Sequence, residues 1–232
     1  MSVGVGSNRQ LHVVMTSSAI NGPEELKGKR IGSDRYGSLS DLILREALRY
    51  HKLAPDRDVA IFQAGGQPER LGALKSGAVD GAILSGDSAF QAEKLGFHTV
   101  IDLSRMPIQY PGSTIVVSKA FLRTRREAVK NFLRGWIEGI KSTRTDKELT
   151  IRVLQKYLKT EDPEILAKTF ELYKNVHEKI PYPEPKVMGI ALKQLSMSIP
   201  QASQLKIEDF TDRSLIAELE SEGLIARLYG AR

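Results

Sequence analysis

The sequence LKGKRIGSDRYGSLSD, which spans residues 26–41, decides the fold of this chain. It indicates a short strand, a polar turn and the start of a helix, because Ser38 stands three residues before Asp41, the spacing of a capping box, and an amphipathic run follows. A helix that opens directly after a strand points its unpaired N–H groups and the positive end of its dipole into the space above the sheet. The stretch therefore predicts a place where a small anion can be held.

The same order of strand, turn and helix recurs twice downstream. Asp58–Phe62 reads as a second strand that leads through Gly65-Gly66-Gln67 into a helix. Ala78–Leu84 reads as a third strand, whose turn Ser85-Gly86-Asp87 opens another helix, and Phe97–Leu103 reads as a fourth strand. Strands joined by single short helices pair in parallel, and ligands gather at their carboxyl ends. We therefore expect an α/β fold in which the three turns share one edge of a parallel-type sheet flanked by helices.

Beyond residue 118 the pattern changes to helices alone, so the C-terminal part is expected to be mainly helical. Lys119–Arg144 combines a wide apolar stripe with the densest cluster of basic residues, which is typical of a core helix with a solvated basic back. Ile180–Pro185 is too rich in proline for a helix and is expected to be a stiff connector. A nucleic-acid partner is not favoured, because the chain has no zinc-finger spacing and no aromatic RNA-binding signature.

The composition excludes several classes of protein. The 232 residues include no cysteine, so disulfides, thiolate catalysis and Cys-ligated zinc are ruled out. No apolar run approaches the roughly 20 residues that cross a bilayer. The opening segment MSVGVGSNRQ lacks the basic and long apolar regions of an export signal. The net charge of +6 favours acidic partners in general.

The sequence contains little that points to catalysis. His12, His51, His98 and His177 are scattered without the spacing of metal ligands. The chain has no G-x-S-x-G elbow and no phosphate loop, and Gly4-Val5-Gly6 lacks the third glycine of a dinucleotide fingerprint. We therefore expect no catalytic residue, no metal site and no cofactor.

Four segments together resemble the solute-binding proteins of ABC importers, most of all the nitrate, sulfonate and taurine type. The segments are EELKGKRIG, GSLSDLILREAL, GGQPERLGALKSGAVDGAIL and YPGSTIVVSKAFL. That family shares its architecture with proteins resembling the yeast thiamine-pyrimidine synthases. The resemblance implies the two-lobed fold of type II periplasmic binding proteins, a small ligand in the cleft between the lobes, a periplasmic or extracytoplasmic location and an ABC permease in the membrane as partner. It also implies a binding protein rather than an enzyme.

The resemblance also implies how the chain divides. Residues 31–103 would form the second lobe, and residues 1–30 and 104–232 the first lobe with the C-terminal helices. Family members have further strand–helix units before the equivalent of Leu11–Thr16, which would be the last strand of the first lobe. We hypothesise that the first lobe is incomplete and that its uncovered surfaces could drive self-association.

The family's ligand contacts, carried over residue by residue, fall in the three turns and in one segment near the crossing between lobes. They are Arg35, Tyr36, Gly37, Ser38, Leu39, Gly65, Gly66, Gln67, Ser85, Gly86, Asp87, Tyr110, Pro111 and Gly112. Arg35 and Tyr36 are either a surface turn or a cation and a phenolic donor over the ligand. Asp87 either caps its helix or selects a cationic group on the ligand.

Two other functions stay open. The first is a pyrimidine-precursor synthase of thiamine biosynthesis, although that family's cysteine-rich motif cannot exist in a chain without cysteine. The second is a regulator whose effector-binding lobes control a partner. We expect the importer component, with a small anion, organic or inorganic, as its ligand.

Overall fold

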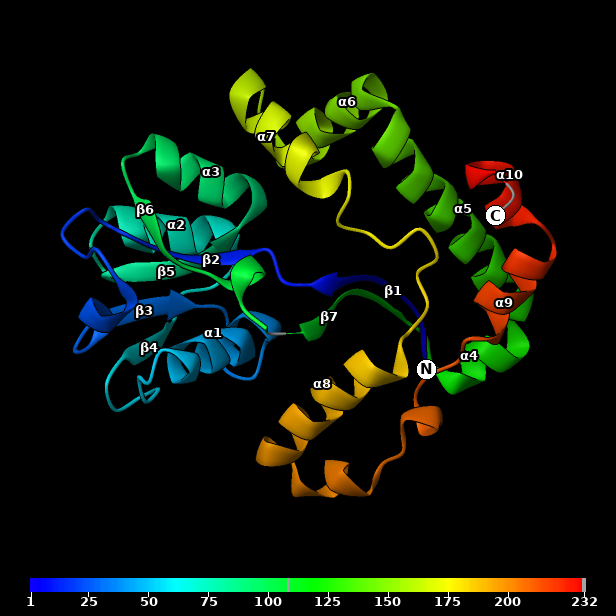
Figure 1. Ribbon diagram of the computed structural model, residues 1–232, viewed down its shortest axis with the longest axis horizontal. Helices are drawn as coiled ribbons and strands as arrows, with labels where there is room; N and C mark the ends of the chain where they lie inside the picture. Colours follow the sequence, from blue (N-terminus) through cyan, green and yellow to red (C-terminus); the bar gives the residue numbers. More distant parts are fainter. Residues whose placement is uncertain (108, 231–232) are drawn as a thin grey trace. The chain divides into compact units, whose positions relative to one another are not determined.

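The structure is a computed structural model that describes residues 1–107 and 109–230. The chain folds into two compact units, each of which is formed by segments that are separate in the sequence (Figure 1). Unit 1 comprises Met1–Arg9, Gln109–Glu161 and Phe170–Arg232. Unit 2 comprises Gln10–Ile108 and Asp162–Thr169.

Unit 2 is built on a five-stranded sheet with the strand order β4-β3-β5-β2-β6. In chain order its strands are β2 (His12–Thr16), β3 (Arg30–Ser33), β4 (Ala60–Gln63), β5 (Gly81–Ser85) and β6 (His98–Asp102). β3 pairs in parallel with both β4 and β5, as the alternation of strands and helices predicts. β2 runs antiparallel between β5 and β6.

The position of β2 corrects the expected boundary between lobes. The sequence analysis assigned Leu11–Thr16 to the first lobe and ended that segment at residue 30, but β2 is hydrogen-bonded inside the sheet of unit 2. Val14 and Met15 are fully buried, because a strand with neighbours on both sides and helices over both faces needs apolar residues on both faces. β6 consequently pairs antiparallel with β2 instead of in parallel with another strand.

Helices cover both faces of this sheet (Figure 1). α1 (Leu39–Tyr50) contacts β3 on one face, while α2 (Gln67–Lys75) and α3 (Gly86–Lys94) contact β5 and each other on the opposite face. Leu71 and Leu74 of α2 pack with residues of α3, β2 and β5 in one apolar cluster. Short 3-10 helices lie at Pro23–Leu26 and Leu103–Arg105. The amphipathic runs that the sequence predicts are therefore the helices that bury the sheet.

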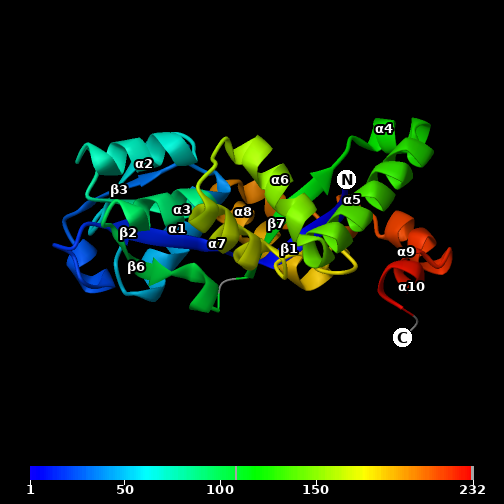
Figure 2. The ribbon, with the colours of Figure 1, turned by 90° about the horizontal axis from the view of Figure 1, so that it is seen from above.

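Unit 1 contains a two-stranded antiparallel ribbon, β1 (Ser2–Arg9) with β7 (Gln109–Val116), surrounded by helices (Figure 2). The helices are α4 (Lys119–Thr124), α5 (Arg126–Thr145), α6 (Lys147–Leu158), α8 (Pro185–Ser198), α9 (Ser214–Ser221) and α10 (Leu224–Tyr229), with 3-10 turns at Pro200–Gln204 and Ile207–Asp209. α7 (Pro163–Tyr173) has residues in both units. The single helix expected over Lys119–Arg144 is interrupted at Arg125, whose backbone leaves the helical region with φ −132° and ψ 37°.

The core of unit 1 joins segments that are far apart in the sequence. Leu133 and Ile137 of α5 are fully buried against Leu215 and Leu219 of α9 and against Val3 of β1. Ion pairs reinforce the same contact between helices: Arg126 with Glu218, Lys130 with Glu218 and Glu222, and Arg134 with Glu222. The basic back of α5 is thus partly neutralised by α9.

Candidate functional site

The candidate site lies at the edge of the unit 2 sheet where β3, β4 and β5 end, which we call the turn edge. The three strands are parallel, so the turns that follow them lie at the same edge. Side-chain amides join these turns: Tyr36 donates its backbone N–H to Gln63 Oε1 at 2.9 Å, and Gln67 Nε2 donates to Ser85 Oγ at 2.6 Å. The backbone N–H of Ser85 donates in return to Gln67 Oε1 at 3.2 Å. The prediction that the three turns share one edge is therefore confirmed.

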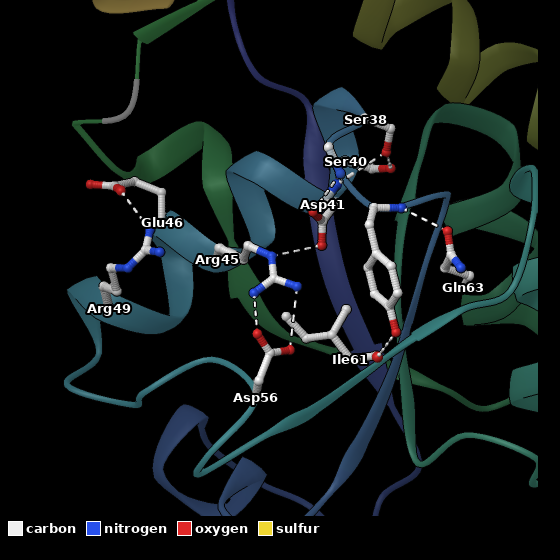
Figure 3. Close-up of polar contacts among 11 residues, drawn as sticks. Ser38, Ser40, Asp41, Arg45, Glu46, Arg49, Asp56, Ile61 and Gln63 are labelled. Atoms are coloured by element: carbon white, nitrogen blue, oxygen red, sulfur yellow. Dashed lines mark hydrogen bonds and ion pairs between the residues drawn. The ribbon is translucent and has the colours of Figure 1, made fainter. Parts of the chain in front are cut away.

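The first turn is closed by the helix cap that the sequence predicts. Ser38 Oγ accepts a hydrogen bond from the backbone N–H of Asp41 at 3.4 Å, and Asp41 Oδ2 accepts one from the backbone N–H of Gly37 at 2.8 Å. The Asp41 carboxylate also pairs with Arg45 at 2.9 Å, and Arg45 extends to Asp56 (Figure 3). These contacts hold the turn against α1. They also mean that both oxygens of the Asp41 carboxylate already have partners within the protein.

Arg35 and Tyr36 lie at the tip of the first turn, and both are exposed. The Tyr36 hydroxyl donates to the Ile61 carbonyl at 3.1 Å, and its ring centroid lies 5.9 Å from the guanidinium carbon of Arg45. The phenolic proton is therefore used inside the protein, which leaves the oxygen lone pairs of Tyr36 for a ligand. These contacts explain Tyr36 as part of the turn, whereas Arg35 stays a predicted ligand contact.

Three of the glycines at the turn edge are required by the backbone. Gly37, Gly65 and Gly86 have φ values of +76°, +84° and +57°, in the left-handed region where any side chain is strained. A Cβ atom on Gly66 would lie 2.8 Å from Glu69 Oε2, because the Glu69 carboxylate lies over the start of α2. Conformation therefore accounts for Gly37, Gly65 and Gly86, whereas at Gly66 the movable Glu69 carboxylate could give way, and contact of any of these glycines with a ligand stays a prediction.

Each helix that begins at the turn edge carries a carboxylate in its own first turn. These residues are Asp41 in α1, Glu69 in α2 and Asp87 in α3. Burial raises the pKa of Asp87, an effect that hydrogen bonds from its own backbone N–H and that of Ser88 oppose. Asp87 Oδ2 also accepts a hydrogen bond from Gln91 Nε2 at 3.3 Å, so this side chain behaves as part of the helix start. Because these carboxylates already interact with the helix dipoles, less of that potential is left for an external anion.

The sequence analysis missed Arg70, the buried cation of this region. Its side chain is 4% exposed, and it donates to the Ile83 carbonyl at 2.7 Å and to the Gly66 carbonyl at 3.2 Å. Burial lowers the pKa of Arg70, and the charges of Asp34 and Glu69 oppose that shift. Arg70 thus ties the start of α2 to the end of β5. A charged residue four positions before Leu74, on the buried side of α2, was the signal available in the sequence.

His12 is the second residue that sequence reasoning missed. It pairs with Ser85 across β2 and β5, and in the part of the chain that the structure describes its buried Nδ1 atom has no hydrogen-bond partner. Burial, with the positive charge of Arg70, lowers the pKa of His12 to about 4, so the imidazole is neutral at pH 7. The Oγ atom of Ser33, at the end of β3, is likewise buried without a partner among the described residues. His12 was overlooked because its strand was assigned to the other lobe.

The remaining predicted ligand contacts are Leu39, at the start of α1, and three residues of strand β7. Leu39 is the half-buried first residue of α1. Tyr110, Pro111 and Gly112 belong to β7 in unit 1, where Gly112 pairs with Ser7 and burial raises the pKa of Tyr110. The structure therefore brings together the predicted residues of the three turns within unit 2, while the fourth segment belongs to unit 1 and its contact with a ligand stays a prediction.

The turn edge offers hydrogen-bonding and charged groups rather than a cluster of metal ligands. Across residues 1–107 and 109–230, no three His, Asp or Glu side chains are close enough together to hold a metal ion. Within the same ranges, no helix combines the length and apolar character that crossing a bilayer requires.

The sheet order and the turn edge define the class of this protein: it has the mixed α/β fold of type II periplasmic binding proteins. The family model described as NMT1/THI5 like matches residues 2–148, which is more than half of the chain, and the chain belongs to that family. The resemblance is thus confirmed at the level of the NMT1/THI5-like family, and binding proteins of the sulfonate type share the fold.

Solved structures of binding proteins have the same fold. The periplasmic aliphatic sulphonate binding protein SsuA of Escherichia coli is 19% identical with a TM-score of 0.70, and the match covers 86% of this chain and 64% of that one. The alkanesulfonate-binding protein SsuA of Xanthomonas axonopodis pv. citri, bound to MOPS, is 17% identical with a TM-score of 0.74, covering 92% and 73%. The desulfurization enzyme DszB is also similar, with 14% identity, a TM-score of 0.68 and coverage of 95% and 79%.

One curated relative is also named as a binding protein. It is named "Putative binding protein YtlA", from Bacillus subtilis (strain 168), and it is 23% identical over 167 residues, which cover 69% of this chain and 48% of that protein. The chain therefore spans about half the length of this curated relative.

Proposed function

We propose that this chain is the solute-binding component of an ABC importer, that it works outside the cytoplasmic membrane with a permease as partner, and that it performs no chemistry of its own. The observation that carries the proposal is the turn edge, where Gln63 and Gln67 join three turns after parallel strands into one polar surface. Membership of the family and the fold shared with binding proteins support it. We further propose that the turn-edge residues contact the ligand.

The ligand that we propose is a small organic molecule with a sulfonate group, and a sulfonate that also carries an amino group suits the charges best. Arg35 supplies an exposed cation at the tip of the first turn. Asp87, a half-buried carboxylate in the first turn of α3, supplies a negative charge. Two sulfonate-binding proteins share the fold. A zwitterion would thus find a partner for each of its charges at one edge of unit 2.

A matched ligand series tests this proposal. Taurine carries both groups, ethanesulfonate lacks the amine and ethylamine lacks the sulfonate. We expect the largest increase in thermal stability with taurine, a smaller one with ethanesulfonate and none with ethylamine, because at equal ligand concentration the ligand that binds the native state more tightly stabilises it more. Calorimetric titration gives the affinities. A flat response to the whole series, extended to nitrate and bicarbonate, contradicts the proposed function.

A pair of arginine variants locates the site. Arg35→Gln removes the proposed cation, and we expect it to weaken the binding of both sulfonates about tenfold. Arg105→Gln is the matched control, because Arg105 is also an exposed arginine of unit 2 but lies after β6 and pairs with Asp102. Equal losses in the two variants would show that Arg35 acts only through net charge.

The assignment as a binding protein rather than an enzyme needs its own test, because the desulfurization enzyme DszB shares the fold. The absence of cysteine from the sequence removes the thiol chemistry that a synthase of the related family would use. We expect taurine and ethanesulfonate to be recovered unchanged by NMR after prolonged incubation with the protein. Release of sulfite or any other product would instead assign an enzyme.

A further inference from the structure

The excess of positive charge resides in unit 1. By sequence, unit 1 contains 21 Lys and Arg against 14 Asp and Glu, whereas unit 2 contains 13 against 14. Unit 2 carries the turn edge, so the basic character of the chain has no evident connection with the proposed ligand. Some other feature of unit 1 has to account for it.

Helix α6 presents apolar side chains to solvent. Leu149, Val153 and Tyr157 are 38%, 44% and 74% exposed, and their spacing of four residues places them along one face of the helix, which we call the α6 stripe. The helix packs on α5 through a different side, where Thr150 is buried and Leu154 is half-buried. The α6 stripe is therefore separate from the face that α6 contributes to the core.

Cations flank the α6 stripe on one side. Arg152 and Lys156 each precede a stripe residue by one position, and Lys159 follows them at helical spacing just beyond the end of α6. All three are exposed, and none of them forms an ion pair with any residue of the described part of the chain. Lys156 Nζ lies 5.6 Å from the centroid of the Tyr157 ring, next to the most exposed residue of the stripe. The nearest acidic residues in sequence are Glu148, four positions before Arg152, and Glu161, two positions after Lys159.

We propose that the α6 stripe and its basic flank form a docking surface for a membrane that contains anionic lipids. An apolar face next to Lys and Arg is the pattern of helices that lie in the bilayer interface, where the apolar side chains enter the acyl boundary and the cations contact the headgroups. Tyr157 suits that depth, because its ring is apolar and its hydroxyl is polar. Long basic side chains can extend toward headgroups while their stems stay apolar. The surface is independent of the turn edge, so the two proposals can fail separately.

Vesicle sedimentation with the full chain tests this assignment. Vesicles of phosphatidylcholine alone are compared with vesicles in which about a third of the lipid is phosphatidylglycerol, since each Lys or Arg near an anionic surface adds to binding. We expect binding to the anionic vesicles that decreases as salt is raised, and little binding to the neutral ones. The absence of binding to anionic vesicles at low salt overturns the proposal.

Surface variants show whether the α6 stripe itself is responsible. Arg152→Glu with Lys156→Glu should lower the partition onto anionic vesicles by about tenfold or more, and Tyr157→Ser should lower it by a smaller factor. The matched control is Lys186→Glu with Lys193→Glu, which makes the same change of charge at exposed positions of α8 in the same unit. An equal loss in the control, or no loss with Tyr157→Ser, overturns the proposal.

An acidic protein partner would contact the same basic side chains. A second probe distinguishes it from a membrane. Fluorescent polyglutamate that binds through Arg152 and Lys156 while the anionic vesicles stay unbound would assign the surface to a protein and overturn the lipid assignment. Taurine affinity, measured in the Arg152→Glu, Lys156→Glu variant, should stay unchanged whatever the vesicles show. This measurement keeps a failure of the docking surface distinct from a failure of the proposed ligand site.

Discussion

Unit 2 and unit 1 differ in how far apart in sequence the segments are that hold each unit together. In unit 2, β3, β4 and β5 are joined by the intervening helices α1 and α2, and the turn edge is made by residues between positions 36 and 85. In unit 1, Ser2 pairs with Val116 across the ribbon, and Arg126 contacts Glu218, 92 residues away. The β3–β5 part of unit 2 therefore depends on connections between successive elements, whereas β2 in unit 2 and the ribbon and core of unit 1 depend on pairing between segments far apart in sequence.

The two units also differ in charge: the surplus of basic residues lies in unit 1, whereas the candidate site lies in unit 2. Unit 2 has nearly equal numbers of acidic and basic residues, and those at the turn edge are largely paired or buried, as Asp41 and Arg70 are. Unit 1 carries the surplus of cations that gives the chain its net charge of +6. The high isoelectric point of the chain thus comes from unit 1, and it gives no information about the charge of a ligand that binds to unit 2.

The largest effect that we predict concerns the long-range core of unit 1. Leu133→Ala removes a fully buried side chain between α5, α9 and β1, so we expect the free energy of unfolding of unit 1 to fall by about 3 kcal/mol. The neighbouring Phe132 is 57% exposed, and Phe132→Ala should change stability by about 0.5 kcal/mol or less. Urea denaturation, with hydrogen exchange to assign the loss to unit 1, measures both. Equal effects of the two substitutions would contradict the packing of α5 on α9.

Local features could be predicted from the sequence because their physics is local. The cap of α1 by Ser38, the glycine turn at Gly65 and the helix start at Gln67 each depend on residues within one helical turn. The common edge of the three turns followed from the length of the connections, since short helices between strands enforce parallel pairing. Those rules cover most of unit 2 and the position of its candidate site.

Features that depend on distant partners could not be predicted in this way. The strand His12–Thr16 is separated in sequence from its sheet neighbours β5 and β6 by two other strands and by helices α1 and α2, so no single connection fixes its place in the sheet, and it was assigned to the wrong lobe. His12 and Arg70 were missed for the same reason, because their proximity follows from the pairing of β2 with β5. The break at Arg125 lies within a run that was read as one helix, although Thr124 and Glu127 have the spacing of a capping box at that point.

The second prediction uses two half-buried histidines, one in each unit. Burial lowers the pKa of His12 from 6.5 to about 4, so the unfolded chain binds a proton that the folded one does not. Stability should therefore fall as the pH drops from about 6.5 to about 4, by about 3 kcal/mol when the shift is fully expressed. His12→Gln should remove most of that loss when urea denaturation is repeated across this range.

His177 of unit 1 provides the comparison. Burial lowers its pKa as well, so its contribution to stability is also lost at acid pH. His177→Gln should reduce the acid sensitivity in the same direction, with the change reported by hydrogen exchange in unit 1 rather than in unit 2. A loss of stability between pH 6.5 and 4 that is as steep in His12→Gln as in the original protein would refute the burial of His12.

The smallest predicted effect compares two glycines that have open space around them. No atom lies within 4 Å of a Cβ atom placed on Gly37 or on Gly139, so packing is not the difference between them. Gly37 has φ +76°, and Gly37→Ala should destabilise unit 2 by about 1 kcal/mol because alanine is strained in the left-handed region. Gly139 is exposed inside α5, and Gly139→Ala should stabilise unit 1 by about 0.5–1 kcal/mol through helix propensity. Opposite signs in thermal unfolding are the expected result. The same sign for both would mean that the first turn does not hold Gly37 in the conformation that the cap of α1 requires.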